Sequence, residues 1–366
     1  MKSLRMIVMG AGVLGIALFA LTGCEEKTSS TTSSTAPKPD DDKTMLDPSL
    51  GRAIAASSAS AAKGPRTAPT AEDGPPPSGV FTLERAEQTH AKGKPLHIEM
   101  GTTGAEPRII LTPTTDAVPK TLGFTVATMM GQRRSLPTVD MTFGLKVEKP
   151  KKKAGDAGVD LLPMPVTSKL TKIVLSAEQP GQIPPEVAQE VAKMNGSQVN
   201  WSFVPTGGIS TVSIERSEKA RPELEHNLVA VVETLASASL PAPEEAVGVG
   251  AAWVARSRDV YGGLDLISYR MIRVIKIDGD RITYGVESRQ YASNPDMVKP
   301  GLPEGGKLVQ FECTASGEFE IVRGQRLAEK GKITHTMKIG LQPPGAQPNQ
   351  MMPLVLQSTV AYPIGG

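Results

Sequence analysis

Few side chains in this sequence are of the types that carry acid–base or metal chemistry. The chain has 366 residues and only four histidines. His97 lies beside Glu99 in a strand-like segment without a second histidine close to it, and His226 lies on a predicted helix, opposite Leu224 and Leu228. A metal or acid–base site needs several such side chains at one place. We therefore assign no site to His97, and we interpret His226 as a solvated side chain.

His335 and Cys313 both lie on apolar faces of predicted strands. Three apolar residues share the face of His335: Ile333, Met337 and Ile339. We interpret His335 as a buried neutral histidine with one hydrogen-bond partner, in preference to a ligand or a general base. Cys313 alternates with Val309 and Phe311, which predicts an unreactive thiol that packs as a small hydrophobe.

Carboxylate pairs offer no better candidates for catalysis. Glu244-Glu245, and Asp265 near Arg258-Asp259, have the character of surface groups. No G-x-S-x-G, H-E-x-x-H, P-loop or EF-hand pattern occurs in the part of the chain that we predict to fold. We therefore assign no catalytic, cofactor-binding or metal-binding residue, and we expect no cofactor.

One nucleotide-binding pattern does occur near the start of the chain. Gly10, Gly12 and Gly15 follow an apolar run and spell G-x-G-x-x-G. The dinucleotide-binding motif also needs an amphipathic helix and a second strand that ends in an acidic residue about 20 positions later. Here the apolar run continues to Leu21 and gives way to Ser and Thr. We interpret these glycines as small residues in the core of a signal peptide.

Residues 1–23 have the organisation of a secretory signal peptide. Lys2 and Arg5 give a positive start, and the almost uncharged residues 6–21 follow. This run is too short to cross a bilayer comfortably as a permanent helix. The pattern predicts a leader that is removed during export.

The end of this leader, Leu21-Thr22-Gly23-Cys24, resembles the lipobox of bacterial lipoprotein precursors. The resemblance implies cleavage between Gly23 and Cys24, a diacylglycerol on the Cys24 sulfur and an acyl group on the new amino terminus. Three acyl chains exceed the two signals needed for stable anchoring, since each buried methylene contributes about 0.8 kcal/mol. The alternative is an ordinary leader, or a helical anchor, that happens to contain a cysteine.

Charge and cysteine content narrow the classes of partner. The chain has 40 Lys plus Arg and 38 Asp plus Glu, and removal of Lys2 and Arg5 with the leader balances the two counts. A neutral balance gives no electrostatic reason to expect a nucleic-acid partner. With Cys24 acylated only Cys313 remains, which excludes an intramolecular disulfide and a thiolate metal cluster.

Residues 24–79 are rich in Ser, Thr, Ala and Pro, which predicts a disordered tether because such a composition buries too little apolar surface. Residues 80–366 predict a mainly β (α+β) fold: an antiparallel curved sheet or half-barrel with two packed helices. They form either one domain or two halves that meet near residues 240–250. A curved sheet with helices in its concavity is also similar to the lipoprotein-carrier type of fold.

Period-two alternation and turn residues give the expected strands. They are residues 107–111, 123–127, 138–147, 169–176, 199–204, 212–214, 253–260, 264–277, 281–290, 308–313, 318–323, 332–339 and 353–362. Asp278-Gly279 predicts a tight hairpin turn. Helices are expected at residues 185–195 and 222–237, the second with one apolar face and with Glu223, Glu225 and Asn227 directed away from it.

Two short motifs resemble those of a family of uncharacterised bacterial envelope lipoproteins. They are Pro75-Pro76-Pro77-Ser78-Gly79-Val80-Phe81 and Val247-Gly248-Val249-Gly250-Ala251-Ala252-Trp253. The resemblance implies no assigned activity, so no functional residue can be carried over. Physically, Gly248 and Gly250 are expected at a close approach or a turn, and Trp253 is expected to be buried.

These observations favour a lipid-anchored protein of the bacterial cell envelope with a non-catalytic binding or structural role. We expect the outer membrane in preference to the inner one, with a protein partner or an apolar ligand in the envelope. One alternative is a carrier or sensor that holds a lipid-like ligand between the sheet and its helices. Another is an envelope hydrolase without a recognisable motif.

Overall fold

The computed structural model describes residues 75–114, 118–131, 134–148, 163–176, 183–261, 263–296, 306–347 and 350–363. All of them belong to the second of two compact units, Asp47–Gly366, and the first unit, Met1–Leu46, lies outside the described residues. The predicted signal peptide, Cys24 and the predicted tether up to residue 74 therefore also lie outside the described residues.

The described chain is mainly β, as predicted, and its helices are few. The helices are α2 (Leu83–Thr89), α3 (Pro185–Ala192), the 3₁₀ turn η2 (Pro222–Leu224) and α4 (Glu225–Ala238). The strands are β1 (His97–Thr102), β2 (Thr121–Met130), β3 (Arg134–Ser135), β4 (Thr138–Val147), β5 (Met164–Ser176), β6 (Gln198–Phe203), β7 (Ile209–Glu215), β8 (Ala252–Tyr261), β9 (Leu264–Asp278), β10 (Arg281–Ala292), β11 (Lys307–Val322), β12 (Lys330–Gln342) and β13 (Met352–Tyr362).

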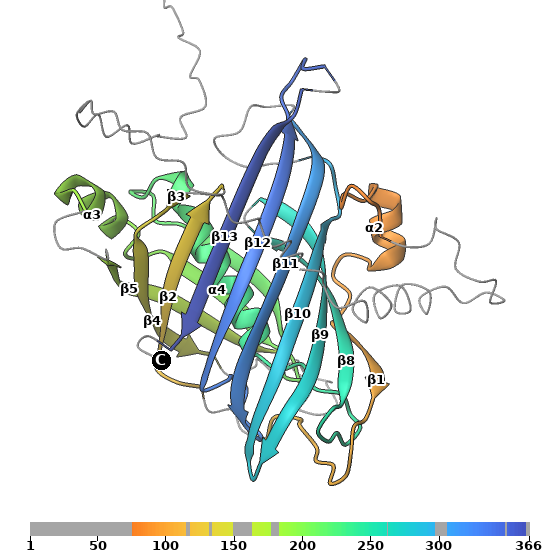
Figure 1. Cartoon of the computed structure of the whole chain (residues 1–366). Helices are drawn as coiled ribbons and strands as arrows, with labels where there is room; N and C mark the ends of the chain where they lie inside the picture. The colour runs from red at the N-terminus through yellow and green to blue at the C-terminus, as the bar shows by residue number, and fades with distance from the viewer. Residues whose placement is uncertain are drawn as a thin grey trace, which may run out of the picture. The chain divides into compact units, whose positions relative to one another are not determined.

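These strands form one antiparallel sheet made of two meanders (Figure 1). Its order is β1-β8-β9-β10-β11-β12-β13-β2-β4-β5-β6-β7, and β3 pairs with β2 outside this path. The second meander, β8 to β13, joins the first through the pairing of β13 with β2, in which Val360 lies opposite Val126. The two sequence halves on either side of residues 240–250 therefore share one continuous sheet.

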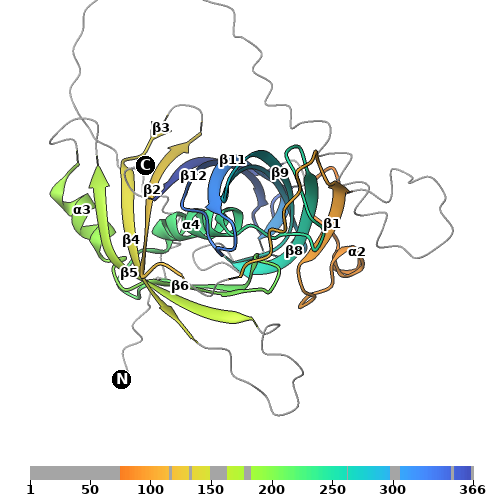
Figure 2. The same ribbon diagram turned by 90° about the horizontal axis from the view of Figure 1, so that it is seen from below.

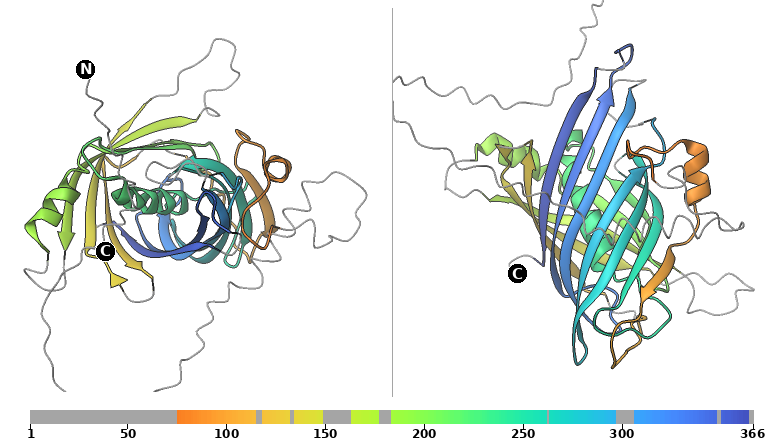
Figure 3. Two further views of the ribbon diagram at one scale, coloured as in Figure 1. Left: turned by 90° about the horizontal axis from the view of Figure 1, so that it is seen from above. Right: turned by 45° about the vertical axis from the view of Figure 1, so that its right-hand side comes forward.

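Helix α4 lies inside the curve of the sheet, whereas α2 lies outside it (Figures 2 and 3). Helix α4 contacts β2, β7, β12 and β13. The Tyr284 hydroxyl on β10 donates to the Ser237 and Ala238 carbonyls of α4 at 3.0 and 3.1 Å. Almost every α4 side chain from Asn227 onward is buried. The predicted apolar face is buried and Glu223 is exposed, as expected, but the prediction that Asn227 is directed away from the core was wrong, because the curled sheet also covers this part of the helix.

Most predicted elements occur, but some differ. Residues 107–111 form only an isolated antiparallel bridge, Ile109 to Val247. The two strands expected at 308–313 and 318–323 are one strand, β11, since both β10 and β12 pair along its polar middle. Helix α2 was not predicted, and its N-cap is Thr82, whose hydroxyl accepts from the Arg85 amide.

The second motif, residues 247–253, has the structure that its glycines and its tryptophan predict. The Trp253 indole is buried and donates to the Pro241 carbonyl at 2.7 Å. A Cβ on Gly248 would lie 1.6 Å from the Ala105 carbonyl oxygen, and Gly250 has a φ of +83°. Gly248 therefore marks a close backbone approach, and Gly250 marks the turn that leads into β8.

The first motif is inserted between the diverging ends of β10 and β11. The Phe311 amide on β11 donates to the Ser78 carbonyl at 2.8 Å, and the Ala292 amide on β10 donates to the Gly79 carbonyl at 3.0 Å. The Phe81 amide in turn donates to the Ala292 carbonyl at 2.8 Å. Backbone hydrogen bonds therefore hold residues 78–81 against the ends of β10 and β11.

Gly79 and Gly93 give a matched test of this insertion. Both have positive φ, but a Cβ on Gly79 would lie 1.6 Å from the Phe311 carbonyl oxygen, while Gly93 has nothing within 4 Å. We expect Gly93→Ala to lower the free energy of unfolding by about 1–2 kcal/mol, the cost of the left-handed conformation. Gly79→Ala should cost roughly 2 kcal/mol more, because the clash breaks hydrogen bonds on both strands. Urea unfolding of the full chain measures the difference, and equal costs would contradict the insertion.

Candidate functional site

The inner face of the sheet carries a row of buried polar side chains that faces α4. Tyr284 contacts α4, so the alternate residues Ser288 and Gln290 of β10 share its face. Cross-strand pairs extend this face from β8 through β13 to β2. We call these residues the inner polar row: Thr128, Ser257, Ser268, Arg270, Ser288, Gln290, Cys313, His335 and Ser358, all of which are buried.

Glu233 of α4 meets this row from the opposite side. Its carboxylate accepts a hydrogen bond from the Gln290 amide at 2.8 Å, and the same amide nitrogen donates to the Ser268 hydroxyl at 3.1 Å. The Arg270 guanidinium donates to the Ser257 hydroxyl at 3.3 Å. The network therefore connects the helix inside the curve to three neighbouring strands.

Burial and Arg270 act in opposite directions on two carboxyl groups of this network. Burial raises the pKa of Glu233, and the positive charge of Arg270 opposes part of that rise. Burial likewise raises the pKa of Asp259, again opposed by Arg270 and by a hydrogen bond from Ser257. The positive charge of Arg270 thus acts on the pKa of both Glu233 and Asp259, so removal of Arg270 would raise both pKa values further.

His335 is buried as predicted, but the predicted hydrogen-bond partner is absent. Among the described residues, neither ring nitrogen has a hydrogen-bond partner. Its cross-strand neighbours explain this: Ala315 has no polar side-chain atom, and the Ser358 hydroxyl is paired with Thr128 at 3.2 Å. Burial, with a smaller contribution from Arg270, lowers the pKa of His335 to about 3, so the imidazole is neutral at pH 7.

Cys313 is a buried free thiol, as the sequence predicts. Burial raises its pKa well above the ordinary value, and the negative charge of Glu233 acts in the same direction. A protonated, enclosed thiol is a poor nucleophile. The strand face around Cys313 is less apolar than Val309 and Phe311 indicate, since Gln290 lies directly opposite Cys313 on β10.

Arg258 and Asp265 were expected at the surface, and this prediction was wrong. The Arg258 guanidinium is buried and makes two contacts of 2.9 Å to the two carboxylate oxygens of Asp265. It also donates to Glu87 of α2 at 2.6 Å and to the His90 carbonyl at 3.1 Å. Burial would raise the pKa of Asp265, but the bond from Arg258 lowers it overall. The unpredicted α2 segment is what covers this pair.

The other sequence candidates lie apart from these groups. Glu244 and Glu245 are exposed, as predicted, and His97 lies on the edge strand β1. His226 is half-buried, and its Nδ1 lies 2.6 Å from the Glu223 carbonyl, so it is less solvated than predicted. The structure therefore brings together Cys313, His335 and Glu233, of which the sequence reading singled out only the first two.

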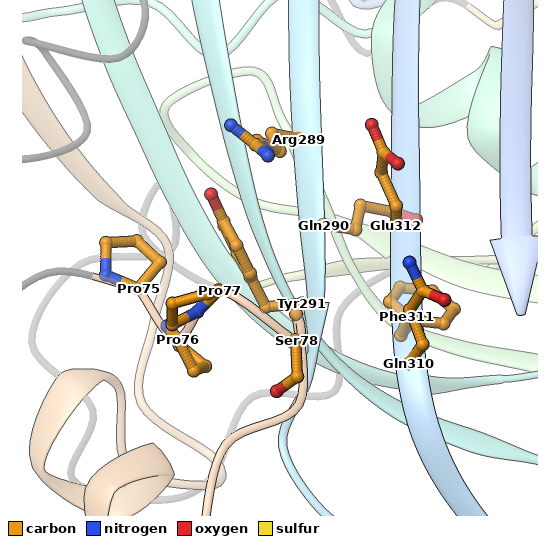
Figure 4. A pocket seen from close by; sticks show the side chains of 11 residues that line it. Pro75, Pro76, Pro77, Ser78, Arg289, Gln290, Tyr291, Gln310, Phe311 and Glu312 are labelled. Atoms are coloured by element: carbon orange, nitrogen blue, oxygen red, sulfur yellow. The ribbon is translucent and has the colours of Figure 1, made fainter. Parts of the chain in front are cut away.

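A surface groove lies where the first motif meets β10 and β11 (Figure 4). It has a volume of about 270 Å³. Its lining residues are Pro75, Pro76, Pro77, Ser78, Gly79, Arg289, Gln290, Tyr291, Gln310, Phe311 and Glu312. We call it the junction groove.

The junction groove presents opposite charges on neighbouring strands. The Arg289 guanidinium lies 5.6 Å from the centre of the Tyr291 ring, and Glu312 accepts from Lys338 at 3.2 Å. Burial raises the pKa of Tyr291 to about 12, so its hydroxyl stays protonated at pH 7. An aromatic floor beside a cation and an anion suits a polar chain such as an extended peptide, which carries donors and acceptors along its length.

Two further observations concern metals and membranes. Within the described ranges, no group of three or more His, Cys, Asp or Glu side chains is arranged to hold a metal ion. None of the helices in these ranges combines the length and the apolar character needed to span a bilayer.

Comparison of the chain with protein-family models and with curated proteins gave no match.

Proposed function

We propose that this chain is a lipid-anchored lipoprotein of the bacterial cell envelope that acts by binding a partner, without catalysis. The observation that carries the proposal is Leu21-Thr22-Gly23-Cys24, placed directly after a signal-peptide core and before a Ser-, Thr- and Pro-rich segment. In this proposal cleavage follows Gly23, and acylated Cys24 holds the folded part at the membrane, with the outer membrane favoured.

The state of the inner polar row supports a structural role for its chemically versatile side chains. Glu233, Cys313 and His335 are enclosed between α4 and the sheet. The thiol is protonated and the imidazole is neutral at pH 7, because burial shifts both pKa values toward the uncharged forms. The hydrogen bonds that Tyr284 and Gln290 make to α4 fix the helix in one position, which is a reason to keep buried polar groups that add little stability.

The placement of α4 also bears on the carrier alternative. Val231 and Leu235, which would line a lipid cavity, are buried in the same core cluster as Trp201, Trp253 and Phe319. An apolar ligand inside the curve would have to displace α4 and break its bonds to Tyr284 and Gln290. We therefore propose that binding takes place at the surface, in the junction groove.

A charge-reversal experiment tests this proposal. Arg289→Glu and Glu312→Lys change the two charges of the groove, and Lys332→Glu changes an exposed charge at the far end of β12 as a control. After crosslinking in the native envelope and purification of the full chain, we expect recovery of the partner to fall about tenfold for the groove variants, which corresponds to about 1.4 kcal/mol. The control should recover as much partner as the unaltered chain. Equal recovery from all three variants would contradict binding in the groove.

A further inference from the structure

The last part of the chain differs in composition from the rest. Residues 339–366 contain no Asp, Glu, Lys or Arg, although these types make up 21% of the whole chain. Its described residues, 339–347 and 350–363, include the end of β12, the β12–β13 hairpin tip and all of β13. An uncharged protein surface can approach an apolar environment without the cost of removing charges from water.

The hairpin tip extends beyond its neighbours (Figure 1). Strands β12 and β13 stay paired up to Leu341 opposite Met352, whereas the last β2 residue, Met130, lies opposite Leu356. Around a shallow hollow in this tip lie Pro343, Pro344, Gly345, Ala346, Gln350, Met351 and Met352. Met351 and Met352 are each 41% exposed. The tip therefore presents flexible apolar side chains ahead of the sheet end.

The first motif meets the sheet at this same end. The first residue of β11, Lys307, pairs with Gln342 beside the tip, and Phe311, also near the start of β11, binds Ser78. The segment that leads back toward Cys24 thus joins the folded part at the sheet end that bears the tip. In an anchored chain, the predicted tether would therefore join the folded part at this end.

We propose that the β12–β13 tip contacts the lipid surface to which Cys24 is anchored, with Met351 and Met352 entering the boundary between headgroups and acyl chains. The proposal rests on the anchoring proposed above. Methionine is unbranched and polarisable, and adapts to irregular apolar surroundings. The anchor keeps the tip at a high effective concentration near the bilayer, so a weak contact is sufficient.

Tryptophan fluorescence in brominated vesicles tests the contact. The two native tryptophans, Trp201 and Trp253, are only 2% and 1% exposed and give a constant background. Met352→Trp reports on the tip, and Ile275→Trp reports on a site near the opposite hairpin that is 46% exposed. With the full lipidated chain in phosphatidylcholine vesicles brominated on the acyl chains, the added fluorescence of Met352→Trp should fall roughly twofold, because the tip would lie at the acyl boundary. That of Ile275→Trp should not change.

Flotation of the vesicles separates the outcomes. A chain that floats but whose Met352→Trp fluorescence is as unquenched as that of Ile275→Trp overturns the tip contact and leaves the anchoring intact. A chain that does not float overturns both. Absence of quenching, together with a blue shift on addition of envelope proteins, would assign the tip to a protein partner and also overturn the lipid contact.

Discussion

Glu233→Ala is expected to lower the free energy of unfolding by about 3 kcal/mol, the upper end of the usual cost of leaving a buried donor without its acceptor. The carboxylate accepts from Gln290 at 2.8 Å, and Arg270 lies close enough to shift its pKa. Removal of the carboxylate leaves the buried Gln290 amide without this acceptor. It also leaves Asp259 as the remaining carboxyl group near the buried Arg270 guanidinium. Against a typical stability of roughly 5–15 kcal/mol, this loss is large. Urea unfolding of the full chain measures it.

Glu233→Gln is the matched control, because its amide oxygen still accepts from Gln290. We expect it to cost only about 1 kcal/mol at low pH.

The pH dependence of the stability has a definite sign. The pKa of Glu233 is raised in the folded state from the ordinary value of 4.5, so the folded chain binds the proton more tightly than the unfolded chain. The stability contributed by the protonated group is lost as pH rises above that value. Glu233→Gln cannot titrate, and it should gain stability relative to the unaltered chain as pH increases.

A double substitution distinguishes charge from packing. If Arg270 without the nearby Glu233 carboxyl group causes most of the loss, Glu233→Leu combined with Arg270→Met should recover most of the stability, since apolar residues of similar size often replace buried charged groups at little cost. A loss below about 1 kcal/mol for Glu233→Ala, or no recovery in the double variant, would show that the network does not hold α4 in place.

The strand pattern was predictable because it depends on local alternation. In β4, Val139, Met141 and Phe143 are buried and the residues between them are less so, as the period of two requires. Turn chemistry was almost equally local: a tight hairpin turn joins β9 and β10 as expected, although its two turn residues are Gly279 and Asp280, one position later than the predicted Asp278-Gly279. Strands and turns are therefore predictable where the residues that determine them are adjacent in the chain.

The inner polar row was not predictable for the opposite reason. Glu233 lies on a helix whose periodicity indicates one buried face, and only the curl of the sheet buries the other. Arg258 is enclosed because α2, about 170 residues away in the chain, supplies Glu87. A signal did exist in the sequence: Ser268, Ser288 and His335 interrupt otherwise apolar strand faces at positions that the register places side by side. That signal becomes readable only when the strand order is known.

Cys24→Ser is expected to abolish incorporation of labelled palmitate and to leave the chain as an uncleaved precursor. The resemblance of Leu21-Thr22-Gly23-Cys24 to a lipobox implies that the sulfur of Cys24 receives the diacylglycerol before cleavage, and a hydroxyl cannot replace it in that thioether. Three acyl chains give essentially complete membrane retention, because two already suffice for stable anchoring. The expected effect is therefore all or none. The measurements are palmitate labelling and the mass of the purified chain.

The second cysteine provides the control for this experiment. Cys313 is the only other cysteine of the chain, and it is buried. Cys313→Ala should label as strongly as the unaltered chain, since an enclosed thiol of raised pKa is neither accessible nor nucleophilic. Label that persists in Cys24→Ser would contradict the anchoring, and with it the premise that the β12–β13 tip and the junction groove work at a membrane surface. Label lost from both variants would point instead to a general failure of export, which the mass of the precursor reveals.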